Sequence, residues 1–267
     1  MAESLIVPII LGALQGIFEW LPISSEGNIT VILSGLGYQP GAAVSLALFL
    51  HLGTAVSATV YYRNPIATIL SSLQDWFQGE TASAPLAFYF VATLTSGIVG
   101  LGSYTLLQEI VSVLTGGAVV ILIGILLVLM GVFQYFSVEK TAVSPSDPTI
   151  IDAILVGIAQ GLAILPGITR SGMTTGTLLL RGYNGTDAFQ FSFVLSIPAA
   201  IGGGLLAAAD SGLQGFSPIG ATAAFLTAAV VGYLSIDILL RLVDRISFGG
   251  VCLSLGALAV VGGLLVL

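Results

Sequence analysis

The sequence predicts an all-α polytopic membrane protein, and its charge, hydropathy and apolar runs are the observations that predict it. The 267 residues include 13 Asp and Glu and 6 Lys and Arg, so the chain is 7% charged and 56% hydrophobic. A soluble domain has about 25% charged residues. Mean hydropathy is +1.09, and the apolar residues form runs near the roughly 20 residues that a membrane-spanning helix needs. This composition excludes a soluble enzyme, a nucleic-acid-binding protein and a disordered chain.

Six stretches are long and apolar enough for spanning helices. In chain order they cover residues 41–62, 84–107, 110–136, 188–209, 218–240 and 248–267. Two further apolar segments, 5–36 and 150–180, are broken by polar and turn-forming residues near their middle. Each half is too short to cross the bilayer, so each segment is predicted to be a re-entrant hairpin buried among the spans.

The two broken segments share a pattern, which predicts an internal repeat. The motif G-x-x-Q-G occurs at residues 12–16 and 157–161, an offset of 145 residues, and the same offset pairs Gly27 with Gly172. Each half would have one hairpin, which returns to the side it came from, and three spans, which end on the other side. The second half would therefore enter the membrane from the opposite side. The chain is therefore predicted to be one membrane domain, 1–267, of two inverted-topology repeats, about 1–140 and about 141–267.

The few cations predict the orientation of the chain. In this scheme one face carries Arg63, Lys140, Arg241 and Arg245. The loops of the opposite face carry Glu109 and Asp210 and no Lys or Arg. By the positive-inside rule the first face is cytoplasmic, and both termini lie outside a cell membrane that the chain crosses several times.

Glu19 and Arg170 are the ionisable residues that sit deep in the broken segments, which makes them candidates for a functional site. Gln15 lies four residues before Glu19 and shares its helix face. Ser24 or Ser25 can cap the short helix after the first turn, and the free N–H groups of such a helix bind anions.

The second turn opens another short helix and adds the guanidinium of Arg170, which suits recognition of a phosphate group. The repeat would place Ser25 and Arg170 at two facing helix tips. A hydroxyl, a carboxylate, an arginine and two helix N-termini inside a membrane predict a site for a phosphorylated, lipid-like ligand.

Structural interpretations of the same residues stay open. A serine at a helix start is often only a cap, and Glu19 can be a buried structural partner of Arg170. His51 is the single histidine and begins an apolar span, so a packed, hydrogen-bonded role is favoured for it. One His and one Cys exclude a His-rich zinc site, a Cys–His pair and a phosphatase that uses two histidines.

At the two turns the chain resembles the undecaprenyl pyrophosphate phosphatase (bacitracin-resistance) family of integral membrane proteins. Residues 15–28 read Q-G-I-F-E-W-L-P-I-S-S-E-G-N, against a family pattern of E/Q-G-x-x-E-x-L-P-x-S-S-x-G-H. Residues 165–172 read L-P-G-I-T-R-S-G, against P-G-x-S-R-S-G. Further similarity lies in residues 50–54 and 189–198, so the resemblance extends over most of the chain.

The resemblance implies two interlocked inverted repeats with re-entrant hairpins. It also implies hydrolysis of an undecaprenyl-type polyprenyl diphosphate to the lipid monophosphate and phosphate, on the outer face. Glu19, Ser25 and Arg170 match the catalytic positions, and Thr174 matches a pocket threonine. The expected substrate-binding residues are Gln15, Ser24, Glu26, Gly27, Asn28, Thr169, Ser171, Gly172 and Thr174.

The chain departs from the family pattern at Asn28, where the pattern has histidine, and at Thr169, where it has serine. Asn28 can bond a phosphate but cannot transfer a proton at neutral pH. Glu19 or Glu26 would then transfer the proton, or the activity would be altered. The rival hypotheses are a lipid-phosphate transporter or flippase of the same fold and a non-catalytic lipid-phosphate binder.

The resemblance also sets the expected cofactors and partners. A divalent cation, Mg²⁺ or Ca²⁺, is considered as a bridge between Glu19 and the diphosphate, and no organic cofactor is expected. The expected partners are a polyprenyl diphosphate lipid and the membrane, with a homodimer left open and no nucleic acid.

Overall fold

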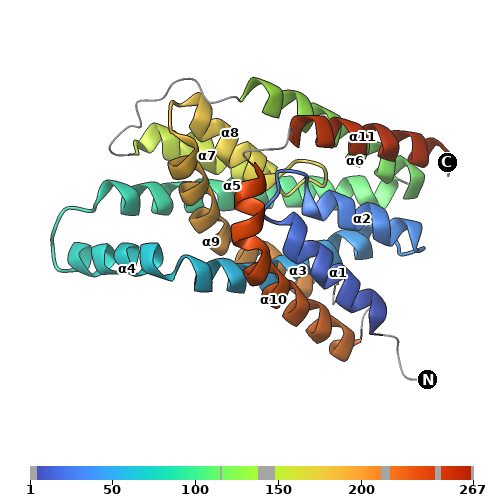
Figure 1. The fold of residues 1–267 in the computed structure, drawn as a ribbon, viewed down its shortest axis with the longest axis horizontal. Helices are drawn as coiled ribbons and strands as arrows, with labels where there is room; N and C mark the ends of the chain where they lie inside the picture. Colours follow the sequence, from blue (N-terminus) through green and yellow to red (C-terminus); the bar gives the residue numbers. More distant parts are fainter. Residues whose placement is uncertain (1–4, 115, 138–147, 212–216, 244–247, 266–267) are drawn as a thin grey trace.

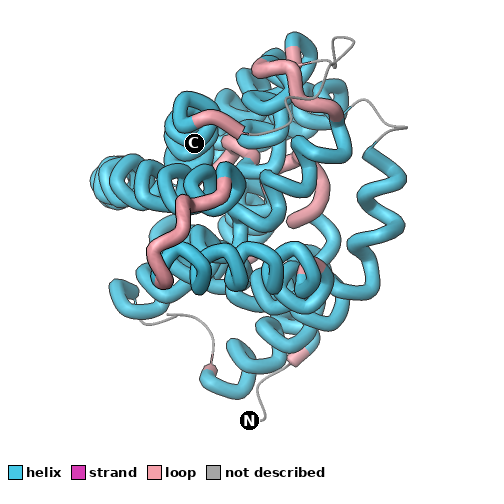
Figure 2. Tube along the Cα trace, turned by 90° about the vertical axis from the view of Figure 1, so that its left-hand side faces the viewer, coloured by secondary structure: helices cyan, strands magenta, loops and turns pink. Residues whose placement is uncertain are grey.

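The computed structural model describes residues 5–114, 116–137, 148–211, 217–243 and 248–265, and within these ranges the chain is helical throughout, joined by turns and loops (Figures 1 and 2). In chain order the helices are α1 (Ile6–Phe18), α2 (Ser25–Gly35), α3 (Pro40–Tyr61), α4 (Arg63–Phe77), α5 (Ala84–Val113), α6 (Gly116–Phe136), α7 (Ile150–Leu162), α8 (Arg170–Leu180), α9 (Gly185–Ser211), α10 (Pro218–Val243) and α11 (Phe248–Leu265).

Five of the described helices, α3, α5, α6, α9 and α10, are long and apolar enough to cross a membrane. They correspond to five of the six spans expected from the sequence, so the prediction of a helical, multi-pass membrane protein is confirmed. The sixth expected span corresponds to α11. Its apolar part within the described residues, Gly249–Leu265, falls in the class of shorter apolar helices, and its role as a span stays a prediction.

The two broken segments form pairs of short helices. Helices α1 and α7 have 13 residues each, and α2 and α8 have 11 each. At about 1.5 Å per residue these helices are at most about 20 Å long, which is less than the roughly 30 Å of hydrocarbon in a bilayer. The turns 19–24 and 163–169 join them, at the positions where the sequence places the breaks.

Two features differ from the expected elements. Helix α4 was not expected because its residues are less apolar than those of a span. It follows α3 after Tyr62, buries none of its side chains and extends with the start of α5 beyond the rest of the bundle (Figure 1). Some charges expected in loops lie in helices: Glu109 is in the last turns of α5, which continues to Val113, Asp210 is in α9, and Arg241 is in α10. Lys140 and Arg245 lie outside the described residues.

Small residues let the helices of the two chain halves approach closely. Helix α1 packs on α10 and α7 packs on α5, while α3 pairs with α9 and α6 with α11. A Cβ on Gly12 would lie 2.3 Å from the Ala224 carbonyl oxygen, and one on Gly157 would lie 2.7 Å from that of Ala92. The glycines of the G-x-x-Q-G motifs therefore act in helix packing, and they position the two turns at the centre of the bundle.

Candidate active site

The first turn, residues 19–24, is closed by its own side chains. Ser24 has a φ of 57°, in the left-handed region that costs a non-glycine residue about 1–3 kcal/mol. Its Oγ accepts a 3.1 Å hydrogen bond from Gly27 N, which makes Ser24 the N-cap of α2. Asn28 Nδ2 donates to the carbonyl oxygens of Ile23 at 2.6 Å and Ser24 at 2.9 Å. Asn28 therefore uses its donor group to stabilise the turn.

The second turn, residues 163–169, is built in a similar way. Thr169 Oγ1 accepts a 3.0 Å hydrogen bond from Gly172 N and so caps α8. Gly167 has a φ of 103°, and a Cβ at this position would lie 2.7 Å from the Ile123 carbonyl oxygen. Glycine is therefore the residue that this turn requires.

The two turns bind each other directly, although 143 residues separate Ser24 from Gly167. Ser24 Oγ accepts a second hydrogen bond, of 3.0 Å, from Gly167 N. Ser171 Oγ donates to the Leu21 carbonyl oxygen at 3.3 Å. A Cβ on Gly27 would lie 2.8 Å from Gly167 N, so the small residue at position 27 allows the turns to touch.

Glu19 and Arg170 form an ion pair where the turns meet. Arg170 Nη2 donates to Glu19 Oε1. The other carboxylate oxygen, Oε2, accepts from Gln15 Nε2 at 2.9 Å and from Ser25 Oγ at 3.2 Å. Both side chains are largely buried, with 5% of Glu19 and 14% of Arg170 exposed. A charge this buried is tolerated because it has an ionic partner and a full set of hydrogen bonds.

His51 also belongs to this centre, which the sequence interpretation missed. Its Nε2 lies 3.2 Å from Glu19 Oε2, and its Nδ1 lies 2.9 Å from the Ala47 carbonyl oxygen in the same helix, α3. The expectation of a hydrogen-bonded histidine is correct but incomplete, because the ring also contacts the carboxylate. The available signal was that the chain's single histidine stands in an otherwise apolar span, in the segment 50–54 that carries part of the family resemblance.

The remaining predicted residues have different surroundings. Arg170 Nη1 approaches the Ser192 carbonyl oxygen at 3.5 Å, and the guanidinium lies 5.5 Å from the ring centre of Phe193. Thr174 Oγ1 donates to the Arg170 carbonyl oxygen at 2.9 Å and lies 2.6 Å from Ser192 Oγ. It therefore supports the backbone and packing of Arg170. Glu26 is buried in the first turn of α2, and its Oε1 has no hydrogen-bond partner.

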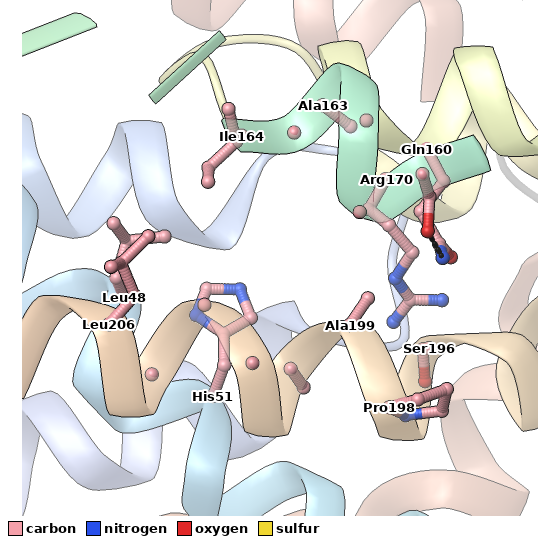
Figure 3. A pocket seen from close by; sticks show the side chains of 18 of the residues that line it. Leu48, His51, Gln160, Ala163, Ile164, Arg170, Ser196, Pro198, Ala199 and Leu206 are labelled. Carbon is pink, nitrogen blue, oxygen red and sulfur yellow. Dashed lines mark hydrogen bonds between the residues drawn. The ribbon is translucent and has the colours of Figure 1, made fainter. Parts of the chain in front are cut away.

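The centre opens into a cavity of about 590 Å³, a volume within the range of small-molecule sites. Glu19, Glu26, His51 and Arg170 line its charged part. The rest of the wall is mostly apolar and comes mainly from α5, α9 and the end of α7. Figure 3 shows His51 and Arg170 pointing into the same space, with Leu48 and Leu206 beside it. An ion pair alone fits a structural role, and this shared cavity gives the pair access to a ligand.

The donors around Glu19 do not fit a bound cation in this arrangement. Arg170 occupies Oε1, while Gln15, Ser25 and His51 surround Oε2. No group of three or more His, Cys, Asp or Glu side chains that could hold a metal ion occurs among the described residues. Glu19 is therefore not assigned as a ligand, and the divalent cation stays a prediction.

The fold and the site define a multi-pass helical membrane protein with a buried ionic centre that faces a mostly apolar cavity. A family model described as bacitracin resistance protein BacA matches residues 8–258. The chain therefore belongs to the bacitracin resistance protein BacA family.

Curated relatives named undecaprenyl-diphosphatase match nearly the whole chain. One from Haloarcula marismortui is 46% identical over 99% of this chain and 99% of its own length. One from Methanococcoides burtonii is 34% identical over 96% and 97%, and one from Methanopyrus kandleri is 36% identical over 94% and 93%. The resemblance expected from the two turn motifs is thus confirmed.

Replacing Ser24 by alanine is expected to destabilise the contact between the turns. Gly27 N and Gly167 N would lose their shared acceptor, and a buried unpaired donor costs about 1–3 kcal/mol. We expect Ser24→Ala to lower the free energy of unfolding in detergent by at least about 2 kcal/mol. Ser45→Ala is the matched control, because Ser45 is equally buried and its Oγ has no hydrogen-bond partner. Equal effects of the two substitutions would contradict this role of Ser24.

Proposed function

We propose that the chain is an integral membrane phosphatase that hydrolyses an undecaprenyl-type polyprenyl diphosphate to the lipid monophosphate and phosphate. The observation that carries the proposal is the cavity that Glu19 and Arg170 share with a long, mostly apolar wall. A charged head group and an isoprenoid tail need this combination of surfaces. The names of the curated relatives support the same substrate.

In the proposed reaction Arg170 neutralises the charge that develops on the transferred phosphoryl group. The free N–H groups at the starts of α2 and α8 add to this, because both helices begin where the turns meet. Glu19 accepts a proton from the attacking oxygen, that of Ser25 or of a water molecule. Ser25 already donates its hydroxyl to Glu19 Oε2 at 3.2 Å.

The remaining predicted residues act at the same phosphate site in this proposal. Gly27 and Gly172 allow the close packing around the two turns, while Ser24, Thr169 and Ser171 hold the turns together. Gln15 orients Glu19 through its 2.9 Å hydrogen bond, and Asn28 and Thr174 support Ser24 and Arg170.

The tail of the lipid would lie between α5 and α9. Gly97 on α5 and Gly202 and Gly203 on α9 line the cavity, and a Cβ on any of them would have no heavy atom within 4 Å. These glycines are therefore not packed against a neighbouring helix. Because these residues have no side chains, the cavity is wider here. This leaves room for a long apolar chain such as the lipid tail.

We also infer that the fold consists of two inverted repeats with six spans and two re-entrant hairpins. The glycines of the first G-x-x-Q-G motif contact α10 at residues 224 and 232, and those of the second contact α5 at 92 and 100. The contacted residues correspond: residues 92 and 224 are 132 positions apart, and so are residues 100 and 232. Gly124 and Gly256 have this spacing too, and a Cβ on either would lie 2.7 or 2.6 Å from the other's carbonyl oxygen. Such exchanged contacts are typical of a pseudo-twofold axis.

For the orientation, the proposal places Arg63, Lys140, Arg241 and Arg245 on the cytoplasmic side of the plasma membrane, with both termini and the hydrolysis outside. Arg63 lies two residues after the end of α3, close to the end of a candidate span, where the positive-inside rule applies. A homodimer stays a prediction.

Phosphate release from a polyprenyl diphosphate by the purified protein tests the proposed activity. Arg170→Gln is expected to lower kcat at least about 100-fold, or about 2.7 kcal/mol, because a charged donor to the phosphoryl group is lost. Arg181→Gln is the matched control, since Arg181 pairs with Asp152 at 2.5 Å and does not line the cavity. It should change kcat by less than about threefold. Absence of phosphate release from the wild type, together with movement of the lipid across liposomes, would favour the transporter instead.

The proposed tail site is tested by filling the cavity from α5. Gly97→Leu is expected to raise KM for the long-tailed diphosphate about tenfold and to spare a diphosphate with a single five-carbon unit, because the new side chain competes with the tail. Gly102→Leu is the control on the same helix, since its Cβ also meets open space but lies outside the cavity lining. An unchanged KM for the long substrate in Gly97→Leu would place the tail elsewhere.

A further inference from the structure

The environment of His51 determines where its protons lie. The Ala47 carbonyl oxygen can only accept, so the 2.9 Å contact places a hydrogen on Nδ1. Nε2 then faces Glu19 Oε2 at 3.2 Å. Without a proton between them, a nitrogen lone pair would point at a carboxylate oxygen in a buried site. The pair therefore holds one shared proton.

The surrounding groups favour His51 as the carrier of this proton. Arg170 donates to one oxygen of Glu19, and Gln15 and Ser25 donate to the other, which stabilises the carboxylate form. The resulting centre contains a guanidinium, an imidazolium and a carboxylate. Arg170 and His51 both line the cavity, where they can bind an anionic ligand.

The other charged groups near α3 do not offer the same chemistry. Glu26 shares the cavity, but no described hydrogen bond or ion pair joins it to Glu19, so it lacks the direct route by which His51 regains a proton from that carboxylate. Asp237 of α10 accepts from Tyr61 at the far end of α3, and Asp187 of α9 accepts from Asn184 at 2.9 Å. Asn28 directs its amide nitrogen to backbone oxygens and cannot transfer a proton.

We propose that His51 is the general acid of the reaction, donating its Nε2 proton to the bridging oxygen of the lipid diphosphate as that oxygen leaves. This proposal rests on the proposed function. It gives the chain's single histidine, which comes from α3, the protonation of the leaving oxygen. The ring lines the cavity and is 16% exposed, so a bound diphosphate can reach it.

The protons balance in this step, written for attack by water. The oxygen of water bonds to the terminal phosphorus, and the bond from that phosphorus to the bridging oxygen breaks. The bridging oxygen stays on the lipid monophosphate and takes the proton of His51. Glu19 takes one proton of the water and passes it to His51 Nε2 across the 3.2 Å contact. The products are the singly protonated lipid phosphate and hydrogen phosphate, and the site returns to its first state.

The test compares two substrates, a polyprenyl diphosphate and its analogue with sulphur as the bridging atom. A sulphur leaving group needs little protonation, so the loss of a general acid affects it far less. His51→Gln retains an amide that can bond Glu19 but cannot donate a proton. We expect kcat for the oxygen substrate to fall about 100-fold or more, and kcat for the sulphur analogue to stay within about threefold of the wild type.

The ratio of the two rates separates catalysis from structure, because it does not depend on the fraction of folded protein. Equal losses on both substrates, or full activity of His51→Gln on the oxygen substrate, would overturn the role of His51. A wild type that hydrolyses neither substrate would instead overturn the proposed function on which this role rests.

Discussion

The contact between Glu19 and Arg170 is the constraint on which the rest of the site depends. The two side chains come from turns far apart in the sequence, and a lone charge at this depth would be costly. Each therefore requires the other turn to be in place. The ion pair, the hydrogen bond from Gly167 N to Ser24 Oγ and that from Ser171 Oγ to the Leu21 carbonyl oxygen join the two broken segments at the centre of the bundle.

The two helix breaks leave backbone groups at the helix ends without partners, and the chain satisfies some of them with its own side chains. Ser24 and Thr169 cap the helices that follow the turns, while the remaining free N–H groups of α2 and α8 become available to an anion. In the proposed function, the same breaks that would weaken an ordinary span provide the phosphate site. The apolar wall between α5 and α9 continues from it, so the head group and the tail of one lipid can be held by one cavity.

Much of this arrangement follows from the sequence. Apolar length predicts α3, α5, α6, α9 and α10, and the polar interruptions predict the turns that carry Glu19 and Arg170. Helix α4 was missed because its composition is mixed and it buries no side chain. The contact of His51 with Glu19 could not be derived, since it depends on how α3 packs beside the first turn. The hydrogen bonds from Asn28 to the backbone of the first turn depend likewise on turn geometry, which residue type alone does not specify.

The most direct test of the account is a double-mutant cycle on the free energy of unfolding, with Glu19→Gln, Arg170→Gln and the double variant in detergent micelles. Removing one partner of a buried ion pair costs about 3–5 kcal/mol, because the other charge remains. The account predicts that the double variant is less destabilised than the sum of the single variants by at least about 1 kcal/mol. Effects that add to within about 0.5 kcal/mol would contradict the claim that this pair holds the two turns together.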